Sequence, residues 1–214
     1  MQRHWLFDLD DTLHHAGAQV FPLITLRMTA YIMQHLQVDE DEAHRLRKLY
    51  WRRYGATLGG LVRHHRIDAD HFLRSTHDMD ELLPLIDSSN QLPQLLSRLP
   101  GRKWVFSNGP QHYVEAMIEH LRIGHLFEEV FGIERFGHPK PRAAAYRQVL
   151  RQSGIAAERC IMVEDTLANL RTARQLGMKT VWLSQQKRKP CWVDYRIGSL
   201  NQLPRLALSA GAAA

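Results

Sequence analysis

Short, almost wholly apolar runs that each end in charged or polar residues constrain this 214-residue chain more than any other feature. Runs without alternation are typical of parallel strands, because helices cover both faces of such a sheet. The sequence predicts strands at residues 5–9, 103–106, 160–163 and 179–183, and a weaker one at 195–197.

Helical patterns separate the later strands. They span residues 113–121, 142–153 and 166–176, and Gly154 and Gly177 follow the last two, where a glycine commonly ends a helix. Strands that alternate with helices predict an α/β fold with a doubly wound, Rossmann-like parallel sheet. In such sheets, ligands bind beyond the carboxyl ends of the strands.

The segment after the first strand breaks this alternation. Helical patterns fill it without a convincing strand, at residues 23–36, 41–54 and 70–75. A chain of this length can bury one α/β core together with an inserted subdomain. We therefore expect a small all-helical domain at residues 19–87, inserted after strand one into a core made of residues 1–18 and 88–214.

Composition places the chain among ordinary globular proteins, with 44% hydrophobic and 23% charged residues. Because no run of about 18 apolar residues is present, neither a signal peptide nor a membrane span is expected. The two cysteines, Cys160 and Cys191, lack CxxC spacing and indicate neither a disulfide framework nor a zinc site. We expect a cytoplasmic protein, monomeric or homodimeric, that does not bind membranes.

The formal net charge of +6 is compatible with nucleic-acid binding, because clustered Lys and Arg release counterions from a phosphate backbone. The arginines are scattered, however, and only residues 186–189 form a short basic run, which a solvated loop explains better. We expect no stable nucleic-acid complex. A general positive field would instead concentrate small anionic substrates.

The densest acidic group lies at the end of the first predicted strand, where Asp8, Asp10 and Asp11 precede Thr12. Carboxylates this close repel one another unless a cation or a proton compensates them. Mg²⁺ binds carboxylate and carbonyl oxygens, which this strand end supplies. The alternative is an Asp-rich turn that caps the next helix, and a lone DxD motif would favour that turn.

Four motifs, in order along residues 6–169, resemble those of the haloacid dehalogenase-like superfamily. A hydrophobic run leads into a DxDxT sequence at residues 6–12, and a second strand ends in a serine at residues 105–109. Lys140 stands before a proline, and an acidic pair follows a strand at residues 163–166. Together the four matches favour a catalytic metal site over a capped turn.

The resemblance implies an aspartyl-phosphate mechanism. Asp8 would be the nucleophile and Asp10 the general acid and base, so that one group serves both halves of the reaction. Ser107 and the Asn108 backbone amide would bind a phosphate oxygen. Lys140 would place its charge on the phosphoryl oxygens and on Asp8.

The same resemblance implies Mg²⁺ as the cofactor. Its ligands would be the Asp8 side chain, the backbone carbonyl of Asp10, the Asp165 side chain and Glu164. Glu164 would ligate directly, through water, or act by orienting Lys140. Alternatively, the acidic pair caps the helix that starts near Thr166, and both roles are compatible.

The helical insertion has the position of the superfamily's C1 cap, which closes over the phosphate site. Residues 49–61 resemble a stretch of the pyrimidine 5′-nucleotidase-like branch, which implies a small phosphorylated metabolite, a nucleoside 5′-monophosphate, as substrate. Tyr50, Arg53 and Tyr54 are the candidate specificity residues, because aromatic rings stack on bases and arginine meets anionic groups. Equally, Tyr50, Tyr54, Leu58 and Leu61 have the spacing of an apolar helix face.

Other functions compete with nucleotide hydrolysis. Phosphoglycolate or sugar-phosphate hydrolysis and a β-phosphoglucomutase-like phosphomutase use the same motifs. A non-enzymatic phospho-acceptor, such as a receiver domain, shares the sheet and the aspartyl phosphate but lacks the Asp10 acid/base and the inserted domain. We therefore expect a phosphatase.

Histidines are numerous, with 13 in the chain. His14, His15, His64 and His65 form two adjacent pairs that lack the HExxH spacing of zinc enzymes. We expect exposed loop or helix residues at these positions and assign them no metal.

Overall fold

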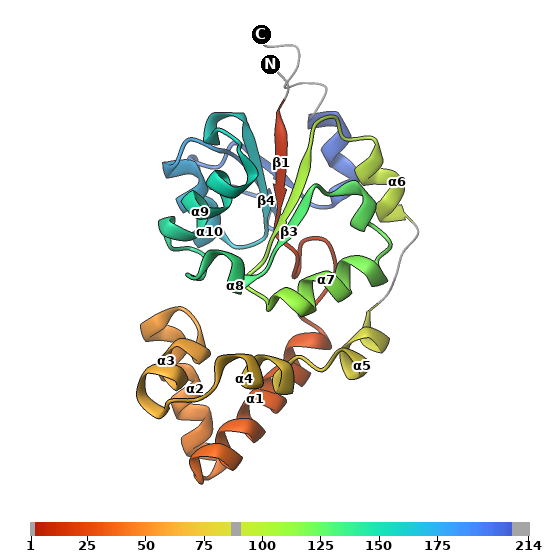
Figure 1. The fold of residues 1–214 in the computed structure, drawn as a ribbon. Coiled ribbons are helices and arrows are strands. Elements are labelled where there is room, and N and C mark those ends of the chain that lie inside the picture. Colours follow the sequence, from red (N-terminus) through yellow and green to blue (C-terminus); the bar gives the residue numbers. More distant parts are fainter. Residues whose placement is uncertain (1–2, 87–90, 207–214) are drawn as a thin grey trace. The chain divides into compact units, whose positions relative to one another are not determined.

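The computed structural model describes residues 3–86 and 91–206, and its ribbon is drawn in Figure 1. The chain divides into two compact units. The core unit comprises Met1–His15 and Asp87–Ala214, and the helical unit comprises Ala16–Ile86. The helical unit thus spans residues 16–86, whereas the sequence suggested an inserted domain at residues 19–87.

A single six-stranded sheet forms the centre of the core unit, with the order β3-β2-β1-β4-β5-β6. Every pairing is parallel, and the order is that of doubly wound nucleotide-binding sheets. The α/β fold class expected from the sequence is therefore confirmed. The strands are β1 His4–Phe7, β2 Lys103–Phe106, β3 Glu129–Phe131, β4 Cys160–Glu164, β5 Lys179–Leu183 and β6 Tyr195–Ile197.

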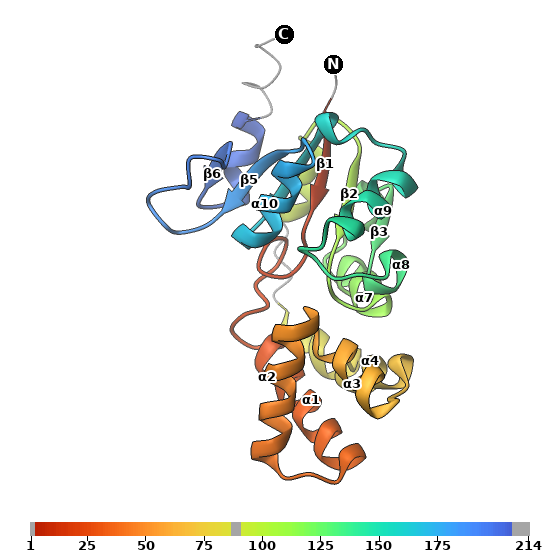
Figure 2. The ribbon, with the colours of Figure 1, turned by 90° about the vertical axis from the view of Figure 1, so that its left-hand side faces the viewer.

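Helices cover both faces of this sheet (Figures 1 and 2). On one face lie α9 (Ala143–Ser153) and α10 (Leu167–Gln175), which pack on an apolar cluster that includes Leu6, Trp104 and Met162. On the other lie α6 (Gln91–Ser97) and α7 (Gln111–His120). Burial on both faces explains why the strands are apolar without alternation.

The strand missing from the sequence prediction is β3. It has only three residues, its first residue is exposed, and it lies at the edge of the sheet. A short edge strand needs no long apolar run, because solvent replaces one of its neighbours. The remaining short elements of the core unit are α8 Ile133–Phe136, η2 Gly124–Leu126, η3 Ala157–Arg159 and η4 Leu200–Gln202.

The helical unit contains no strand among its described residues, as the sequence suggested. Its longest helices, α1 (Val20–Leu36) and α2 (Glu40–Tyr54), match the expected patterns, whereas α3 (Thr57–His65) was not predicted as a separate helix. Asp39 caps α2 by accepting a hydrogen bond from the Glu42 N–H at 2.8 Å, and Gly55 ends it with a φ of 83°. The helices are α1 Val20–Leu36, α2 Glu40–Tyr54, α3 Thr57–His65, α4 Ala69–Thr76, α5 Met79–Leu82 and η1 Leu83–Leu85.

Helices α2 and α3 approach each other closely at Gly60. A Cβ atom at this position would lie 2.0 Å from Cγ of Tyr50, far inside van der Waals contact. Glycine is therefore the residue that lets the Tyr50 ring pack against α3. Tyr50 belongs to the apolar cluster of this unit, together with Ile32, Leu61 and Phe72.

Asp194 ties the start of β6 to β5. Its carboxylate accepts hydrogen bonds from the backbone N–H and the hydroxyl of Thr180, at 2.9 and 3.0 Å, and pairs with Lys179 at 3.1 Å. Burial raises the pKa of Asp194, but the hydrogen bonds from Thr180 and Lys179 outweigh it, so that the pKa lies below its ordinary value.

The Asp194→Ala substitution should lower the free energy of unfolding by about 2 kcal/mol at pH 7, because hydrogen bonds to a charged group are lost. Since the folded-state pKa is depressed, this stabilisation is present above the ordinary Asp pKa of about 4 and is lost as the pH falls through the folded-state value. Urea unfolding from pH 7 to pH 3 should therefore show a shrinking difference from wild type. Asp70→Ala, which removes an exposed partner of Arg74, is the control and should cost less than about 0.5 kcal/mol.

Candidate active site

The carboxyl ends of β1, β2 and β4 bring the predicted site residues together. Phe7 of β1 is level with Val105 of β2 and with Val163 of β4. Asp8 continues β1 by donating its N–H to the Val163 carbonyl at 3.0 Å. Asp8, Ser107 and Glu164 thus end neighbouring strands at the point where the strand order reverses, which is where doubly wound sheets bind ligands.

A tight turn follows Asp8. The Leu9 carbonyl accepts from the backbone N–H groups of Thr12, Leu13 and His14, at 3.2, 2.8 and 3.4 Å, and Asp11 adopts a φ of 57°. The Thr12 hydroxyl donates to Asp8 Oδ2 at 3.3 Å. The turn therefore fixes the side chain of the nucleophile candidate Asp8 through Thr12, and it places His14 beside Asp10.

The ammonium of Lys140 is buried at the centre of the site. Its three N–H bonds meet three acceptors: Asp8 Oδ1 at 2.6 Å, Glu164 Oε2 at 3.0 Å and the Phe106 carbonyl at 2.8 Å. Burial lowers the pKa of Lys140, but the negative charges of Asp8 and Glu164 raise it by more. The pKa therefore lies above its ordinary value, and the ammonium keeps its charge.

The carboxylates around Lys140 carry more negative charge than one ammonium balances. Burial raises the pKa of Asp8 to about 8, and Glu164 adds to that rise, which Lys140 opposes. Burial likewise raises the pKa values of Glu164 and Asp165. Oxygen atoms of Asp8, Glu164 and Asp165 lie within 4.8 Å of one another. This donor set fits a hard divalent cation, which would supply the missing positive charge.

The loop that carries Lys140 is clamped by the Asn108 side chain. Asn108 Oδ1 accepts from the Lys140 N–H at 2.7 Å, and its Nδ2 donates to the Lys140 carbonyl at 3.1 Å. The Thr172 hydroxyl donates to the Pro141 carbonyl at 2.7 Å and fixes the other side. The sequence suggested only a backbone role for Asn108, because an amide clamp on a distant loop leaves no local pattern.

Glu164 is saturated by hydrogen bonds. Besides Lys140, Oε2 accepts from Asn169 Nδ2 at 3.0 Å, and Oε1 accepts from the Thr166 N–H at 3.1 Å. Asp165 is half-buried, and its backbone carbonyl accepts from the Trp182 indole N–H at 2.7 Å. Of the roles open to Glu164, this arrangement favours orienting Lys140, and it leaves Asp165 the more accessible carboxylate.

Asp10 is held by partners that the sequence analysis did not assign to the site. Asp10 Oδ1 accepts from the Tyr113 hydroxyl at 2.5 Å and lies 3.0 Å from His14 Nε2, and Ser107 Oγ lies 3.4 Å from Oδ2. The expectation of an exposed His14 was wrong, because this contact buries the ring, although His15 is exposed. Burial and the Asp10 charge raise the pKa of Tyr113 well above its ordinary value, so the phenol stays a donor.

The three candidate specificity residues of the helical unit differ in exposure. Tyr50 is only 6% exposed, and its hydroxyl hydrogen-bonds His65 Nε2 at 2.6 Å. Arg53 is exposed, with its guanidinium 5.7 Å from the centre of the Tyr54 ring. The Tyr54 hydroxyl reaches His64 Nε2 at 2.5 Å. Burial leaves Tyr50 little ring surface for a ligand, and it fits the apolar-face alternative.

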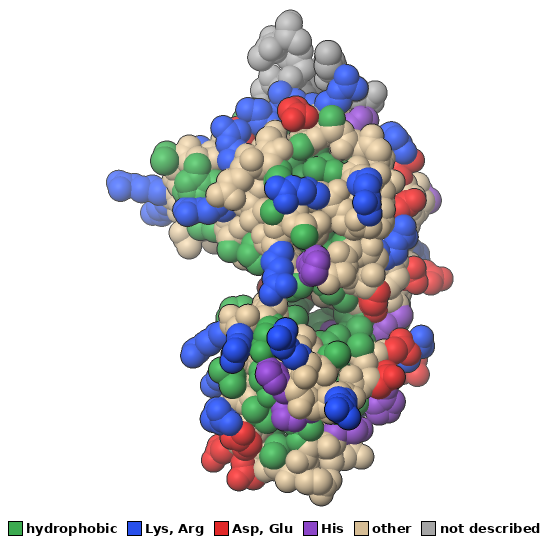
Figure 3. All heavy atoms as spheres, turned by 60° about the vertical axis from the view of Figure 1, so that its left-hand side comes forward, with side chains coloured by type: hydrophobic (Ala, Val, Ile, Leu, Met, Phe, Trp, Pro, Cys, Tyr) green, Lys and Arg blue, Asp and Glu red, His purple; other side chains and the backbone are tan. Residues whose placement is uncertain are grey.

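Positive charge does not gather into one patch on the face drawn in Figure 3, where Lys and Arg side chains stand at separate places. The basic run Lys187, Arg188 and Lys189 is exposed, as expected of a solvated loop. Among the described residues, no helix is both long and apolar enough to cross a membrane.

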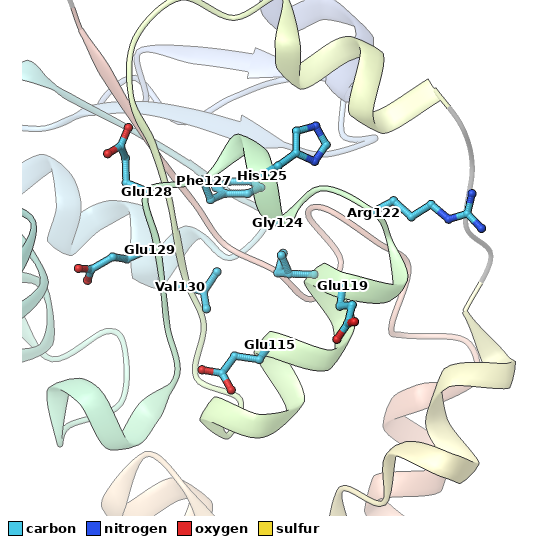
Figure 4. A pocket seen from close by; sticks show the side chains of 10 residues that line it. Glu115, Glu119, Arg122, Gly124, His125, Phe127, Glu128, Glu129 and Val130 are labelled. Atoms are coloured by element: carbon cyan, nitrogen blue, oxygen red, sulfur yellow. The ribbon is translucent and has the colours of Figure 1, made fainter.

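A hollow of the core unit, of about 600 Å³, lies beside α7 and β3 (Figure 4). Four glutamates line it, Glu115, Glu119, Glu128 and Glu129, against one arginine, Arg122. Because this lining is acidic, it would repel a phosphate dianion, and the hollow contains none of the predicted site residues.

The haloacid dehalogenase-like hydrolase family matches residues 3–177, and the chain belongs to this family. Curated relatives include phosphate metabolism protein 8 of Saccharomyces cerevisiae, 27% identical over 81% of this chain and 59% of the relative. A glyceraldehyde 3-phosphate phosphatase of Methanocaldococcus jannaschii is 26% identical over 92% and 93%. A phosphoglycolate phosphatase of Pseudomonas fluorescens is 23% identical over 76% and 52%. The chain thus spans little more than half of two of these relatives.

Solved structures share the fold. The HAD phosphatase from Thermococcus onnurineus superposes with a TM-score of 0.70 at 16% identity, covering 96% of this chain and 97% of that one. The L-2-haloacid dehalogenase from Xanthobacter autotrophicus, with chloropropionic acid covalently bound, gives 0.64 at 14% identity, covering 97% and 99%. Both a phosphatase and a dehalogenase therefore have this architecture, and the chemistry must be argued from the site.

The Lys140→Met substitution should lower the free energy of unfolding by about 3 kcal/mol, because two buried carboxylates lose the ammonium that they share. Chemical denaturation measures the change. Lys103→Met is the matched control, since Lys103 is also buried but donates to the Gly101 carbonyl at 3.1 Å. It should cost less than about 1 kcal/mol, and equal losses in both variants would contradict the role of the ion pair.

Proposed function

We propose that this protein is a Mg²⁺-dependent phosphomonoester hydrolase that works through an aspartyl-phosphate intermediate. The observation that carries the proposal is the pairing of two differently held carboxylates at one strand end. Asp8 accepts a hydrogen bond from the buried Lys140 ammonium, whereas Asp10 accepts one from the neutral Tyr113 hydroxyl. Such a difference suits a nucleophile beside a general acid and base.

In the first half-reaction, an Asp8 carboxylate oxygen attacks phosphorus, the bond from phosphorus to the leaving oxygen breaks, and Asp10 donates its proton to that oxygen. In the second, water attacks the phosphoaspartate phosphorus while Asp10 takes its proton, releasing inorganic phosphate and restoring Asp8. Ser107 and the Asn108 N–H are the proposed donors to the phosphoryl oxygens. In both half-reactions, the positive charge of Lys140 compensates negative charge at Asp8.

Asp8, Asp165 and the Asp10 carbonyl are the proposed Mg²⁺ ligands, with Glu164 contributing through Lys140 or through water. When bound, Mg²⁺ neutralises charge between a carboxylate nucleophile and a phosphoryl group. The grouping of Asp8, Glu164 and Asp165, whose oxygens lie within 4.8 Å of one another, supports a cation at this place.

The proposed substrate is a nucleoside 5′-monophosphate, with a pyrimidine base, and the helical unit is the proposed C1 cap. The likeness of residues 49–61 to the pyrimidine 5′-nucleotidase-like branch supports this choice. Arg53 and Tyr54 offer a cation and an aromatic ring on one surface of α2, which suits stacking on a base. Tyr50 has a packing role in this proposal.

A second candidate substrate is a small phosphorylated acid or aldehyde. The names of two relatives, a phosphoglycolate phosphatase and a glyceraldehyde 3-phosphate phosphatase, favour it. A dehalogenase is disfavoured chemically, because a halide leaves without a proton and would make no use of Asp10 as an acid. A phosphomutase would return a phosphorylated product instead of inorganic phosphate.

The deciding experiment measures inorganic phosphate released from a panel of esters by the purified protein with Mg²⁺. We expect release from UMP and CMP and none after chelation with EDTA, with no chloride released from 2-chloropropionate. Turnover of phosphoglycolate or glyceraldehyde 3-phosphate well above that of nucleotides would select the second candidate. No release from any ester would refute the hydrolase.

Two variants test the assigned roles in the same assay. Asp8→Asn should reduce turnover on the order of 10⁴-fold or more, because the nucleophile is lost. Asp10→Asn should reduce it about 10²- to 10⁴-fold, the usual contribution of general acid–base catalysis. Wild-type activity in Asp8→Asn would rule out the aspartyl-phosphate route.

The base-reading role of α2 predicts a substrate-selective effect. Arg53→Ala and Tyr54→Ala should each lower kcat/KM for UMP roughly tenfold, the cost of losing one stacking partner. Their kcat/KM for p-nitrophenyl phosphate should stay near wild type. Arg52→Ala, which removes a neighbouring exposed arginine, is the control for charge. Equal losses on both substrates would remove Arg53 and Tyr54 from substrate recognition.

A further inference from the structure

The two oxygens of Asp10 have different surroundings. Oδ1 receives the Tyr113 hydroxyl at 2.5 Å and His14 Nε2 at 3.0 Å. Among the described residues, the one donor that reaches Oδ2 is the Ser107 hydroxyl, at the longer distance of 3.4 Å. Ser107 Oγ itself accepts from the Gly109 N–H at 2.9 Å. One oxygen is therefore anchored by donors, and the other faces the proposed phosphate-binding serine.

The His14 ring can donate to Asp10 in only one tautomer. Its Nδ1 is buried and has no hydrogen-bond partner among the described residues. A proton on Nδ1 would be buried without an acceptor, and the Nε2 lone pair would then face a carboxylate. The arrangement therefore requires the proton on Nε2, where it points at Oδ1.

The two partners come from separate elements of the core unit. Tyr113 lies on α7, 103 positions along the chain from Asp10, and its buried side chain turns the hydroxyl toward Asp10 and His14. His14 comes from the turn after β1 and is the fourth residue after Asp10. Two separate elements thus supply donors to the same oxygen, and this double contact fixes the orientation of the Asp10 carboxylate.

We propose that Tyr113 and His14 are positioning residues that anchor Asp10 Oδ1, so that Oδ2 carries the exchangeable proton. This inference rests on the proposed hydrolase reaction. A protonated Asp10 has its proton on Oδ2, because donors occupy Oδ1. That proton passes to the leaving oxygen as its bond to phosphorus breaks, and Oδ2 later takes a proton from the attacking water.

The test compares leaving groups, because only a poor leaving group needs the proton. Glycerol phosphate has an alkoxide leaving group, whereas p-nitrophenolate leaves without protonation. For Tyr113→Phe, kcat/KM for glycerol phosphate should fall roughly 10- to 100-fold, while kcat/KM for p-nitrophenyl phosphate changes less than about threefold. This parameter reports only the steps up to phosphoryl transfer and therefore isolates the acid role.

Tyr146→Phe is the matched control. Tyr146 is also a buried tyrosine of the core unit, but its hydroxyl donates to the Asn169 carbonyl at 2.9 Å. Loss of the Tyr146 hydroxyl should leave the ratio of the two kcat/KM values unchanged, whatever its effect on stability. At the second position, His14→Leu should alter the ratio as Tyr113→Phe does, and His14→Gln, which keeps a donor, should restore part of it.

The outcomes separate the inference from the function it rests on. A changed ratio in Tyr113→Phe and His14→Leu supports the anchoring of Asp10. Equal losses on both substrates, or no loss, overturn it while the hydrolase stands. If the wild type hydrolyses neither of these esters, UMP replaces glycerol phosphate, because its leaving group is also an alkoxide. If the wild type hydrolyses no ester with Mg²⁺ present, the proposed function and the inference both fail. Melting temperatures of the variants identify any that do not fold, and the other position then decides.

Discussion

The rest of the site depends on the hydrogen bonds and ion pairs of the buried Lys140 ammonium. Its three donors join a strand-end carboxylate, a carboxylate of the neighbouring strand and a backbone carbonyl of a third. Removing a cation from water is costly, and only a full set of acceptors offsets that cost. The Asn108 clamp and the saturation of Glu164 follow from this need, because they hold the acceptors and the loop in one geometry.

How much the sequence predicted depended on whether each residue belonged to a local pattern. Asp8, Ser107 and Glu164 follow apolar runs, and parallel pairing brings such strand ends together, so their meeting was predictable. Tyr113 lies in a helix where its spacing indicates only core packing. Its hydroxyl meets Asp10 because of how α7 packs on the sheet, and no spacing along the chain contains that information.

The helical unit illustrates the opposite limit. Its residues 49–61 carry both a family likeness and an apolar periodicity, and the sequence did not decide between them. The packing assigns Tyr50 to the apolar cluster, because Gly60 lets its ring press against α3, while Arg53 stays exposed. A stretch with one family likeness can thus divide into buried and exposed positions within a single helical turn.

The strand order has a consequence for synthesis on the ribosome. Strand β1 carries the nucleophile candidate but pairs with β2 and β4, so it waits for partners that end at Phe106 and Glu164. The apolar cluster of the helical unit is complete once Leu73 has emerged. Pairing of strands that are far apart in the sequence costs loop-closure entropy, whereas local contacts between helices form early. During translation the helices therefore have the chance to assemble first, with the aspartates attached to an unpaired strand until the second half of the chain arrives.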